Sequence, residues 1–531
     1  MDGRPTPVLD ARAMRALDRF TIDSGTPGLE LMERAGRAVT GHIATNIVTA
    51  DGGRVLVLAG RGSNGGDGLV IARLLVERGW QVDVALVAGE PAANSDAATN
   101  LGRWRDLEQG PALDLDAATR ALATEEPGYV LVVDTIFGTG LDRELNGEMS
   151  ELVGVLNSAR SRSGLAVLAV DLPSGLSADS GQRLGAAVTA DNTITIGAGK
   201  PGLFLGAGIE AAGRVTVADI GLAGPADAGL DVLGEVLDER GCRRFLSPRG
   251  RGAHKGSQGH LLIIGGSSGK TGAAKLAARA ALRSGAGLVS LAVPSSVAAA
   301  VDSEFTEAMT IAVADREGQL DRGAMAGLAE LERFDAIVAG PGLGTGPGAA
   351  ELVEALVSTV EVPLLLDADA LNVVAAGIGT AALARARAGR PLTLTPHPGE
   401  MARLLGTDSA TVQNDRLAAC RKVLADGSPT VVLKGAATIV ASAEQLAFNS
   451  SGNPGMATAG MGDVLAGTIG ALAAAGSEPF EAAALGVYLH GTAADILAGG
   501  LGGPGFLAGE VADTLPRALA ALMRGPSAPE L

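Results

Sequence analysis

The chain contains 531 residues, with 42 lysines and arginines against 59 aspartates and glutamates, a formal net charge of −17 and only 2% aromatic residues. The length suggests about two to four domains, and an acidic chain with few aromatic side chains argues against nucleic-acid binding, which needs basic and stacking surfaces. Two distant cysteines, no signal-like start and no long apolar run predict a soluble cytoplasmic protein that does not bind membranes.

Short apolar runs recur through the first part of the chain, and helical patterns fill several of the gaps between them. The helical patterns cover Ala11–Ile22 and Leu69–Arg78. The expected strands are Arg54–Ala59, Val82–Val87, Tyr129–Asp134, Ala166–Asp171, Thr193–Ile196 and Val215–Ala218. Strands that alternate with helices predict a parallel sheet covered by helices.

The segment Gly221–Val236 loses this alternation and is rich in Gly, Ala, Pro and Asp, which is typical of a linker. We therefore expect a first domain over 1–222, a linker over 223–245 and a second α/β domain over 246–525. The second domain should contain helices at Ala273–Ser284 and Asp463–Ala475 and a hairpin around Lys434–Phe448. Its expected strands are Leu261–Ile264, Leu288–Val293, Ala336–Ala339, Pro363–Asp367, Leu392–Thr395 and Val431–Lys434.

A glycine-rich turn follows the first strong strand, and Gly60, Gly62 and Gly65 formally match the dinucleotide fingerprint G-x-G-x-x-G. Asp67 counts against this interpretation, because a carboxylate beside a pyrophosphate repels it. The alternative is a glycine turn in which Asp67 caps the helix.

Polar side chains follow two further strands. Asp134 and Asp171 each stand at a strand end, and Ser174 follows the second of them. Because the carboxyl ends of parallel strands meet at one edge of a sheet, these loops should converge there. Asn64, Asp134 and Ser174 would then offer hard oxygen ligands to a divalent ion or a large monovalent ion. The alternative for each aspartate is a turn or a helix cap.

Taken together, four motifs of the first block resemble the NAD(P)H-hydrate epimerase family: Ser-Asn-Gly-Gly-Asp-Gly (63–68), Asp-Thr-Ile-Phe-Gly-Thr-Gly (134–140), Asp-Leu-Pro-Ser-Gly (171–175) and Gly-Ala-Gly-Lys-Pro-Gly (197–202). The resemblance implies a Rossmann-like three-layer domain, interconversion of R and S hydrates (NADHX and NADPHX) at C6 of the nicotinamide ring, and Asp171 as the acid/base group. It implies potassium bound through Asn64, Asp134 and Ser174. It also implies substrate contacts by Ser63, Asn64, Gly65, Gly66, Asp67, Gly138, Thr139, Gly140, Leu141, Asp142, Arg143, Glu144 and Asp171.

The second block opens with a strand, a glycine turn and Lys270-Thr271, which suggests a P-loop. Ile264 stands where that motif needs a glycine, so the standard P-loop is excluded. Further along, His397 and Glu400 lie between a strand and a helix, where His397 could also be a plain loop residue. Asp463 begins an apolar helix whose free N–H groups would suit an anion, although Asp463 could merely be the N-cap.

These loops resemble the ribokinase-like superfamily and, within it, the ADP-dependent (S)-NAD(P)H-hydrate dehydratases. The resemblance rests on Gly-Gly-Ser-Ser-Gly-Lys-Thr-Gly-Ala-Ala (265–274), Gly-Pro-Gly-Leu-Gly (340–344), Leu-Asp-Ala-Asp-Ala-Leu-Asn (366–372), Thr-Pro-His-Pro-Gly-Glu (395–400), Lys-Gly-Ala (434–436) and Gly-Met-Gly-Asp (460–463). It implies hydrate contacts by Ala274, Gly342, His397 and Asp463, with Asp463 catalytic. It implies ADP, with Mg²⁺, bound by Lys434, Gly435, Ala436, Ala437, Thr438 and Gly462. The family often has tyrosine where Lys270 stands, which leaves that contact open.

The two resemblances together predict a bifunctional metabolite-repair enzyme. The first domain would epimerise NADHX and NADPHX, and the second would dehydrate the S form to NADH or NADPH while ADP becomes AMP and phosphate. We also expect a homo-oligomer. The alternatives are a ribokinase-like small-molecule kinase with a fused binding domain, a non-catalytic sensor of pyridine nucleotides, and a dehydrogenase, which rests on Gly60–Gly65 alone.

Overall fold

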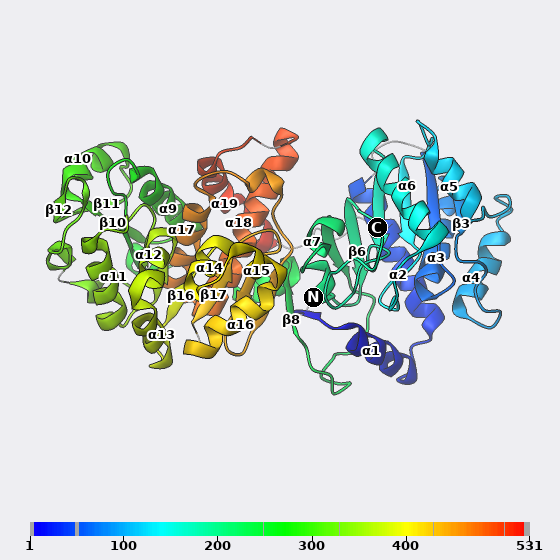
Figure 1. Ribbon diagram of the computed structural model, residues 1–531, viewed down its shortest axis with the longest axis horizontal. Helices are drawn as coiled ribbons and strands as arrows, with labels where there is room; N and C mark the ends of the chain where they lie inside the picture. Colours follow the sequence, from blue (N-terminus) through cyan, green and yellow to red (C-terminus); the bar gives the residue numbers. More distant parts are fainter. Residues whose placement is uncertain are drawn as a thin grey trace. The chain divides into compact units, whose positions relative to one another are not determined.

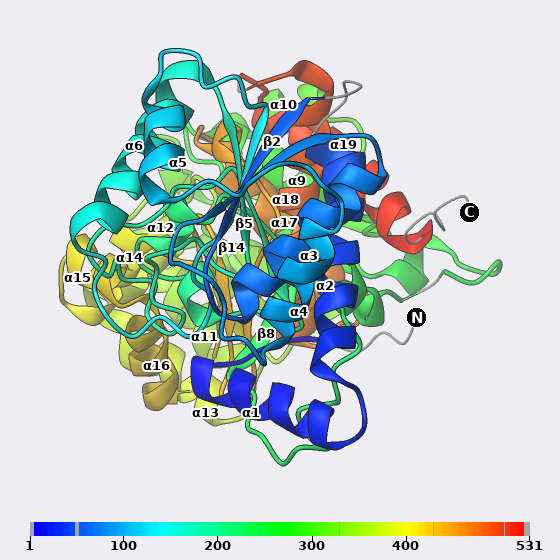
Figure 2. The ribbon, with the colours of Figure 1, turned by 90° about the vertical axis from the view of Figure 1, so that its right-hand side faces the viewer.

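The computed structural model describes residues 5–47, 53–247, 249–328, 330–427, 429–503 and 505–524. The chain divides into two compact units, one over Thr6–Glu235 and the other beginning at Val236 (Figures 1 and 2). The C-terminal limit expected at 525 lies outside the described residues. Each unit is described by itself.

The N-terminal unit is built around a parallel sheet with the strand order β3-β2-β4-β5-β6-β7. Because β3 lies on one side of β2 and β4 on the other, the strand order reverses at β2, which is where ligands bind in sheets of this kind. The strands are β2 (Arg54–Ala59), β3 (Gln81–Leu86), β4 (Leu131–Thr135), β5 (Ala166–Val170), β6 (Asn192–Ile196) and β7 (Arg214–Ala218).

Alternate residues of these strands face two different helix layers. Val55 and Val57 of β2 pack with α2 (Gly28–His42), α3 (Ser63–Glu77) and α4 (Asp96–Arg105). Leu56 and Leu58 pack on the opposite face with α5 (Leu115–Ala123) and α6 (Gly147–Ser163). Burial on both faces explains why these strands are continuous apolar runs. The predicted three-layer α/β architecture is confirmed, and α1 (Ala11–Asp23) and α7 (Gly208–Ala211) complete the unit.

The C-terminal unit has a larger mixed sheet, in which the order from one edge is β8-β19-β18-β17-β16-β15-β14-β9-β10-β11. Every neighbouring pair from β17 through β16, β15, β14, β9 and β10 to β11 is parallel. The pairs β17–β18 and β18–β19 are antiparallel, which confirms the predicted hairpin. The strands are β8 (Gly234–Leu237), β9 (His260–Ile264), β10 (Leu288–Pro294), β11 (Met309–Val313), β14 (Ala336–Ala339), β15 (Leu364–Leu366), β16 (Leu392–Leu394), β17 (Thr430–Leu433), β18 (Ile439–Ala441) and β19 (Leu446–Asn449). A separate hairpin joins β12 (Asp315–Arg316) to β13 (Gln319–Leu320).

Four helices pack into one core on this sheet: α9 (Thr271–Ser284), α17 (Met461–Ala474), α18 (Pro479–Leu501) and α19 (Ala508–Arg524). Gly467 of α17 makes this packing close, because a Cβ atom there would overlap the backbone of Ala277. The other helices are α8 (Glu239–Cys242), α10 (Ser295–Glu304), α11 (Pro347–Thr359), α12 (Ala368–Val373), α13 (Gly379–Arg387), α14 (Pro398–Leu405), α15 (Ser409–Asn414) and α16 (Arg416–Gly427) (Figure 1).

The structure differs from the sequence prediction in the segment expected to link the domains. Residues 221–233 form neither helix nor strand, but β8 and α8 lie within the predicted linker. Leu237 and Cys242 are buried in the core of the C-terminal unit. The apolar run in β8 is too short to stand out from its Gly- and Asp-rich surroundings. Strand β11 and the β12–β13 hairpin were also not predicted.

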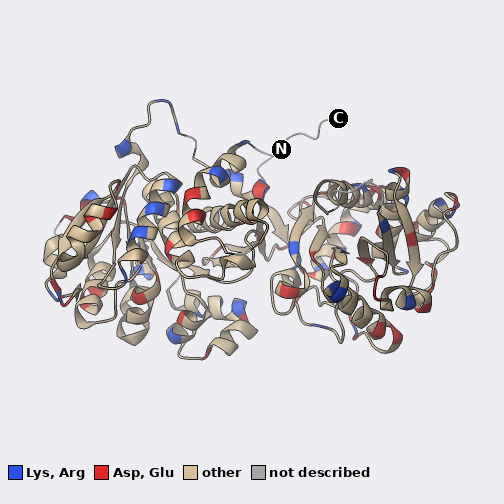
Figure 3. Ribbon diagram, turned by 90° about the horizontal axis from the view of Figure 1, so that it is seen from above, with Lys and Arg blue, Asp and Glu red and all other residues tan. Residues whose placement is uncertain are grey.

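Acidic and basic residues are interspersed along the helices of both units (Figure 3). Among the described helices, none combines the length and the apolar character needed to cross a membrane.

Candidate active sites

The glycines after β2 allow three backbone segments to meet closely. A Cβ atom at Gly60 would overlap the carbonyl oxygen of Ile136, and one at Gly65 would overlap the carbonyl oxygen of Gly60. These two glycines therefore join the loop after β2 to the loop after β4 and to the start of α3. Their match to a dinucleotide fingerprint has this structural explanation.

Asp67 lies inside α3, several residues after the position that caps the helix. The N-cap is Gly62, so that interpretation of Asp67 is wrong. Burial raises the pKa of the Asp67 carboxyl well above its usual value, with the charges of Asp171 and Asp18 adding to the rise and Lys200 opposing it. The four side chains thus form one electrostatic cluster, and neither Asp18 nor Lys200 was singled out from the sequence.

Asp134 and Ser174 are joined directly at the edge of the sheet. The Ser174 backbone N–H and hydroxyl donate to Asp134 Oδ2 and Oδ1 at 2.8 and 2.6 Å. Burial raises the pKa of Asp134 to about 6, against the hydrogen bonds from Ser174. Gly68 packs against Thr135, which brings the first turn of α3 to the end of β4.

Asn64 lies in that first turn of α3, and both of its amide atoms are buried without a hydrogen-bond partner among the described residues. A buried amide with no partner is costly, so these atoms suit a polar ligand or an ion at this position. A Cβ atom at Gly138 would lie 3.5 Å from the Asn64 Cγ atom, so Asn64 also borders the loop after β4.

Asp171 follows β5 and has a φ angle of +69°, in the left-handed region that non-glycine residues seldom adopt. Its Oδ1 atom accepts a hydrogen bond from Lys200 Nζ at 2.6 Å. Its Oδ2 atom accepts one from the Thr139 N–H at 3.2 Å. A Cβ atom at Gly138 would be 2.7 Å from that Oδ2 atom, so the predicted substrate loop 138–144 runs directly past the Asp171 carboxylate.

In the C-terminal unit, the loops after β9 and β14 are held together in a similar way. The Ser267 N–H and hydroxyl both donate to the Gly342 carbonyl at 2.7 Å. Gly342 has φ of +63°, and a Cβ atom there would be 2.5 Å from the Lys270 carbonyl oxygen. Lys270 Nζ lies 3.0 Å from Asp369 Oδ2. Ala274, by contrast, is fully buried in the core beneath this loop.

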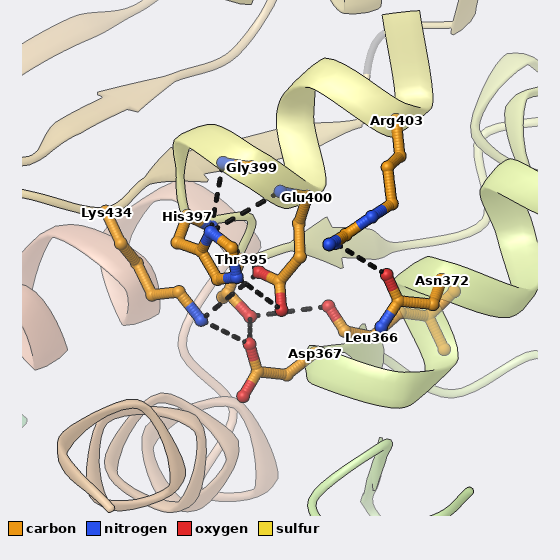
Figure 4. A network of polar contacts seen from close by, with 9 residues as sticks. All are labelled: Leu366, Asp367, Asn372, Thr395, His397, Gly399, Glu400, Arg403 and Lys434. Carbon is orange, nitrogen blue, oxygen red and sulfur yellow. Dashed lines mark hydrogen bonds and ion pairs between the residues drawn. The ribbon is translucent and has the colours of Figure 1, made fainter. Parts of the chain in front are cut away.

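Asp367, Thr395, Glu400 and Lys434 form a buried polar network at the ends of β15, β16 and β17 (Figure 4). Asp367 Oδ1 accepts from Lys434 Nζ at 2.7 Å and from the Thr395 hydroxyl at 2.8 Å. Glu400 Oε2 lies 3.7 Å from Lys434 Nζ. Burial lowers the pKa of Lys434, but the carboxylates of Asp367 and Glu400 outweigh burial and hold this pKa above its usual value.

His397 is the N-cap of α14 as well as a candidate ligand contact. Its Nδ1 atom accepts from the Gly399 and Glu400 N–H groups at 3.0 and 3.4 Å, and Glu400 Oε2 accepts from the His397 N–H (Figure 4). Burial lowers the pKa of the ring, with Glu400 opposing and Lys434 adding to that effect. The neutral ring therefore carries its proton on Nε2, on a side chain that is half exposed.

Asp463 lies in the first turn of α17, and the N-cap of that helix is Gly460, so the N-cap interpretation of Asp463 is also wrong. The Asp463 carboxyl has no hydrogen-bond partner among the described residues. Burial raises its pKa to about 7, with Asp367 adding to the rise and Lys434 opposing it. A Cβ atom at the preceding Gly462 would be 3.3 Å from Lys434 Nζ, so the start of α17 faces that ammonium.

The loop 434–438 is held from behind by a buried arginine that was not predicted. Arg416 donates to the carbonyl oxygens of Leu433 at 2.9 Å and Ala436 at 2.7 Å, with longer bonds to Lys434 and Ala437. The Thr438 hydroxyl donates to the Gly435 carbonyl at 2.8 Å. The structure thus brings Lys434, Gly462 and Asp463 together and fixes the loop that begins at Lys434.

Two family models match the chain. One described as "NAD(P)H-hydrate dehydratase" matches residues 261–517, and one described as "YjeF-related protein N-terminus" matches residues 28–202. A bifunctional NAD(P)H-hydrate repair enzyme from Moorella thermoacetica is 41% identical, covering 96% of both chains. One from Escherichia coli is 37% identical, covering 92% of this chain and 89% of the relative. The solved ADP/ATP-dependent NAD(P)H-hydrate dehydratase from Bacillus subtilis is 29% identical, covers 55% of this chain and 99% of its own, and has a TM-score of 0.45.

Proposed function

The chain belongs to the family of bifunctional NAD(P)H-hydrate repair enzymes, and from this premise we propose that its two units carry out two steps of one repair, with Asp171 and Asp463 as the catalytic groups. The N-terminal unit epimerises NADHX and NADPHX, and the C-terminal unit dehydrates the S form to NADH or NADPH. The observation that carries the assignment is an acidic cluster that holds a buried or half-buried lysine at the ligand-binding edge of each sheet. The pairing is useful because a stereospecific dehydratase leaves the R epimer unrepaired.

Epimerisation needs the hydroxyl at C6 to leave and return. A proton added to the hydroxyl lets it depart as water while the ring nitrogen forms a C=N bond. Water then adds to C6 from the opposite face and gives up a proton. Asp171 is the proposed acid/base group for both transfers, because its carboxylate faces the Gly138–Thr139 segment of the proposed substrate loop.

Potassium is the proposed ion of the N-terminal unit, held through Asn64, Asp134 and Ser174. The donor set fits a hard cation, since it offers a carboxylate, a hydroxyl and the amide oxygen of Asn64, which has no partner among the described residues. When bound, the ion supplies positive charge and joins the loops that flank the hydrate.

The C-terminal unit faces a poor leaving group, since hydroxide does not depart readily. We assign to Asp463 removal of the C6 hydroxyl proton while the hydroxyl oxygen attacks the β-phosphorus of ADP and AMP leaves. The ring nitrogen then expels the phosphate, and loss of the C5 proton restores the dihydronicotinamide. Hydrate and ADP thus give NADH, AMP and phosphate. A carboxyl with a pKa of about 7 is well matched to this transfer near neutral pH.

The remaining contacts are proposed from the site geometry. Lys434 and the N-terminus of the 14-residue helix α17 supply positive charge for the ADP phosphates. Residues 434–438 and Gly462 are the proposed nucleotide contacts, and Mg²⁺ would accompany the phosphates. His397, whose Nε2 atom lies 3.3 Å from Glu400 Oε1, is a proposed hydrate contact. Gly342, in the loop that Ser267 holds, is another. Ala274 can contribute only through the helix backbone, because its side chain is buried.

The decisive experiment supplies purified protein with a mixture of R- and S-NADHX and ADP, and monitors NADH absorbance. Wild type should convert the whole mixture. Asp463→Asn should form no NADH, and Asp171→Asn should convert the S fraction rapidly and the rest only at the rate of spontaneous epimerisation. Absence of NADH with wild type, or a phosphorylated product that accumulates with ATP, would contradict the repair assignment and favour a small-molecule kinase.

A further inference from the structure

We propose that Lys200 is a positioning residue for epimerisation, which fixes the Asp171 carboxylate in its working orientation. The inference rests on the proposed function of the N-terminal unit. Lys200 lies in the loop after β6, 29 residues beyond Asp171 in the chain, and touches the reaction through that carboxylate alone.

Lys200 is a buried ammonium with all three of its donor positions used. Its side chain is 0% exposed. Its Nζ atom donates to Asp171 Oδ1 at 2.6 Å, to the Thr195 hydroxyl at 3.0 Å and to the Ile196 carbonyl at 2.7 Å. A lysine has three donors, so this ammonium has none left for a substrate and cannot rotate without breaking a bond. Lys200 can therefore act on the reaction only by holding its three acceptors in place, and Asp171 is the one of them in the proposed active site.

The bond to Oδ1 determines where the other oxygen of Asp171 points. With Oδ1 tied to Lys200, Oδ2 faces Gly138 and accepts the Thr139 N–H. Asp171 adopts this arrangement at a φ of +69°, a backbone strain that persists only where the surroundings enforce it. The short bond from a fully buried lysine is the strongest such restraint that Asp171 makes among the described residues.

Lys200 bonds one of three neighbouring carboxyls. Asp18 from α1 and Asp67 from α3 face Asp171, and Arg15 of α1 donates to the Thr139 carbonyl at the rim. Burial raises the pKa of Asp18 to about 6 and that of Asp67 well above its usual value. The one lysine of this cluster is bonded to Asp171 rather than to either of the others.

The bifunctional chain provides its own control for this proposal. Dehydration of S-NADHX reports on the C-terminal unit, while conversion of R-NADHX requires epimerisation as well. We would compare Lys200→Met, Lys200→Arg, Asp171→Asn and the double variant Lys200→Met/Asp171→Asn. Circular dichroism and thermal unfolding would establish that each variant is folded.

Lys200→Met should lower the epimerase kcat about 100-fold with KM nearly unchanged, because it removes orientation rather than substrate contact. Lys200→Arg should recover part of the rate. The double variant should be no slower than Asp171→Asn alone, since Lys200 acts only through Asp171.

The outcomes separate the inference from the function on which it rests. If Asp171→Asn retains epimerase activity, the proposed role of Asp171 fails. If Asp171→Asn is inactive but Lys200→Met is folded and keeps the wild-type kcat, only the inference about Lys200 fails. Should Lys200→Met not fold, the isosteric Thr195→Val decides: it removes one acceptor of the ammonium, and an unchanged kcat there overturns the proposal.

Discussion

Each unit places a lysine against an aspartate at the edge of its sheet, but the two lysines hold different carboxylates. Lys200 bonds Asp171, the group to which we assign proton transfer. Lys434 bonds Asp367 instead, and Asp463, the proposed base of the C-terminal unit, has no hydrogen-bond partner among the described residues. The pKa of Asp463 rises to about 7. One site thus fixes its working carboxylate, while the other leaves its own free to titrate.

The two lysines also differ in exposure. The Lys200 side chain is 0% exposed, whereas Lys434 is 17% exposed and faces Gly462 at the start of α17. A partly exposed lysine can contact an anionic ligand, whereas a fully buried lysine can only orient the side chain to which it is bonded. A lysine–aspartate pair therefore suits phosphate binding in the C-terminal unit and orientation of the aspartate carboxylate in the N-terminal unit.

The largest effect should come from removing the open lysine. We expect Lys434→Met to lower dehydration of S-NADHX about 10³-fold, because the ADP phosphates lose their cation and Asp367 and Glu400 are left as unpaired buried charges. Epimerisation in the same molecules should be unchanged, as measured by exchange between R and S forms separated chromatographically. An equal loss of dehydratase and epimerase activity would mean that Lys434 does not act on dehydration alone.

The free carboxylate should appear in the pH dependence of the dehydratase. Asp463 acts as a base only when ionised, and its raised pKa of about 7 means that it is protonated at lower pH. The dehydratase kcat/KM should therefore rise about tenfold per pH unit up to about pH 7 and then level off. The residual rate of Asp463→Asn should lack this limb. A wild-type profile that is flat from pH 5 to pH 8 would contradict the assignment.

A smaller effect should result from loosening the loop behind Lys434. Arg416→Lys can reach fewer of the four carbonyls that Arg416 bonds, so we expect KM for ADP to rise about tenfold with little change in the KM for the hydrate. The matched control is Arg385→Lys, because Arg385 is also fully buried and donates to backbone carbonyls, those of Val360, Val362 and Pro391. The control should lower the melting temperature alone. Similar KM values for both variants would show that Arg416 is only structural.

The smallest effect should be the response of the N-terminal unit to potassium. Replacing a bulky organic cation by potassium should raise its melting temperature by about 2–4 °C, since an ion that binds only the folded state stabilises it. Asn64→Ala should remove this response. A rise of the same size in Asn64→Ala would place the ion elsewhere.

The sequence predicted the strands and the site loops well because both depend on local patterns. Buried parallel strands appear as continuous apolar runs, and the loops after them are marked by glycines such as Gly60 and Gly342, where backbones approach closely. The side chains that work through distant contacts were missed. Lys200 meets Asp171, Asp18 joins from the first helix, and Arg416 clamps the loop after β17, and no local spacing reveals such contacts.

The two N-cap alternatives fail for the same physical reason. Asp67 and Asp463 come after glycines and before apolar helices, a pattern that favours an N-cap. In both places the helix begins earlier, at Gly62 and Gly460, so the carboxyl is carried into the first turns and into the site. Whether an aspartate caps a helix or stands inside it depends on where the chain leaves the preceding loop, and tertiary packing decides that.

The short strand β8 determines where this protein can be cut into two working pieces. Leu237, Cys242 and Phe245 anchor residues 234–245 in the core of the C-terminal unit, although they precede the expected start of that domain. A fragment beginning at residue 246 would lack β8 and leave β19 open to pairing with other chains, a route to aggregation. Ala223, Ala228 and Leu230 pack against the core of the N-terminal unit, so a breakpoint between Leu230 and Gly234 spares both cores. A split gene or a truncation library should therefore yield a soluble dehydratase only when its fragment begins at or before Gly234.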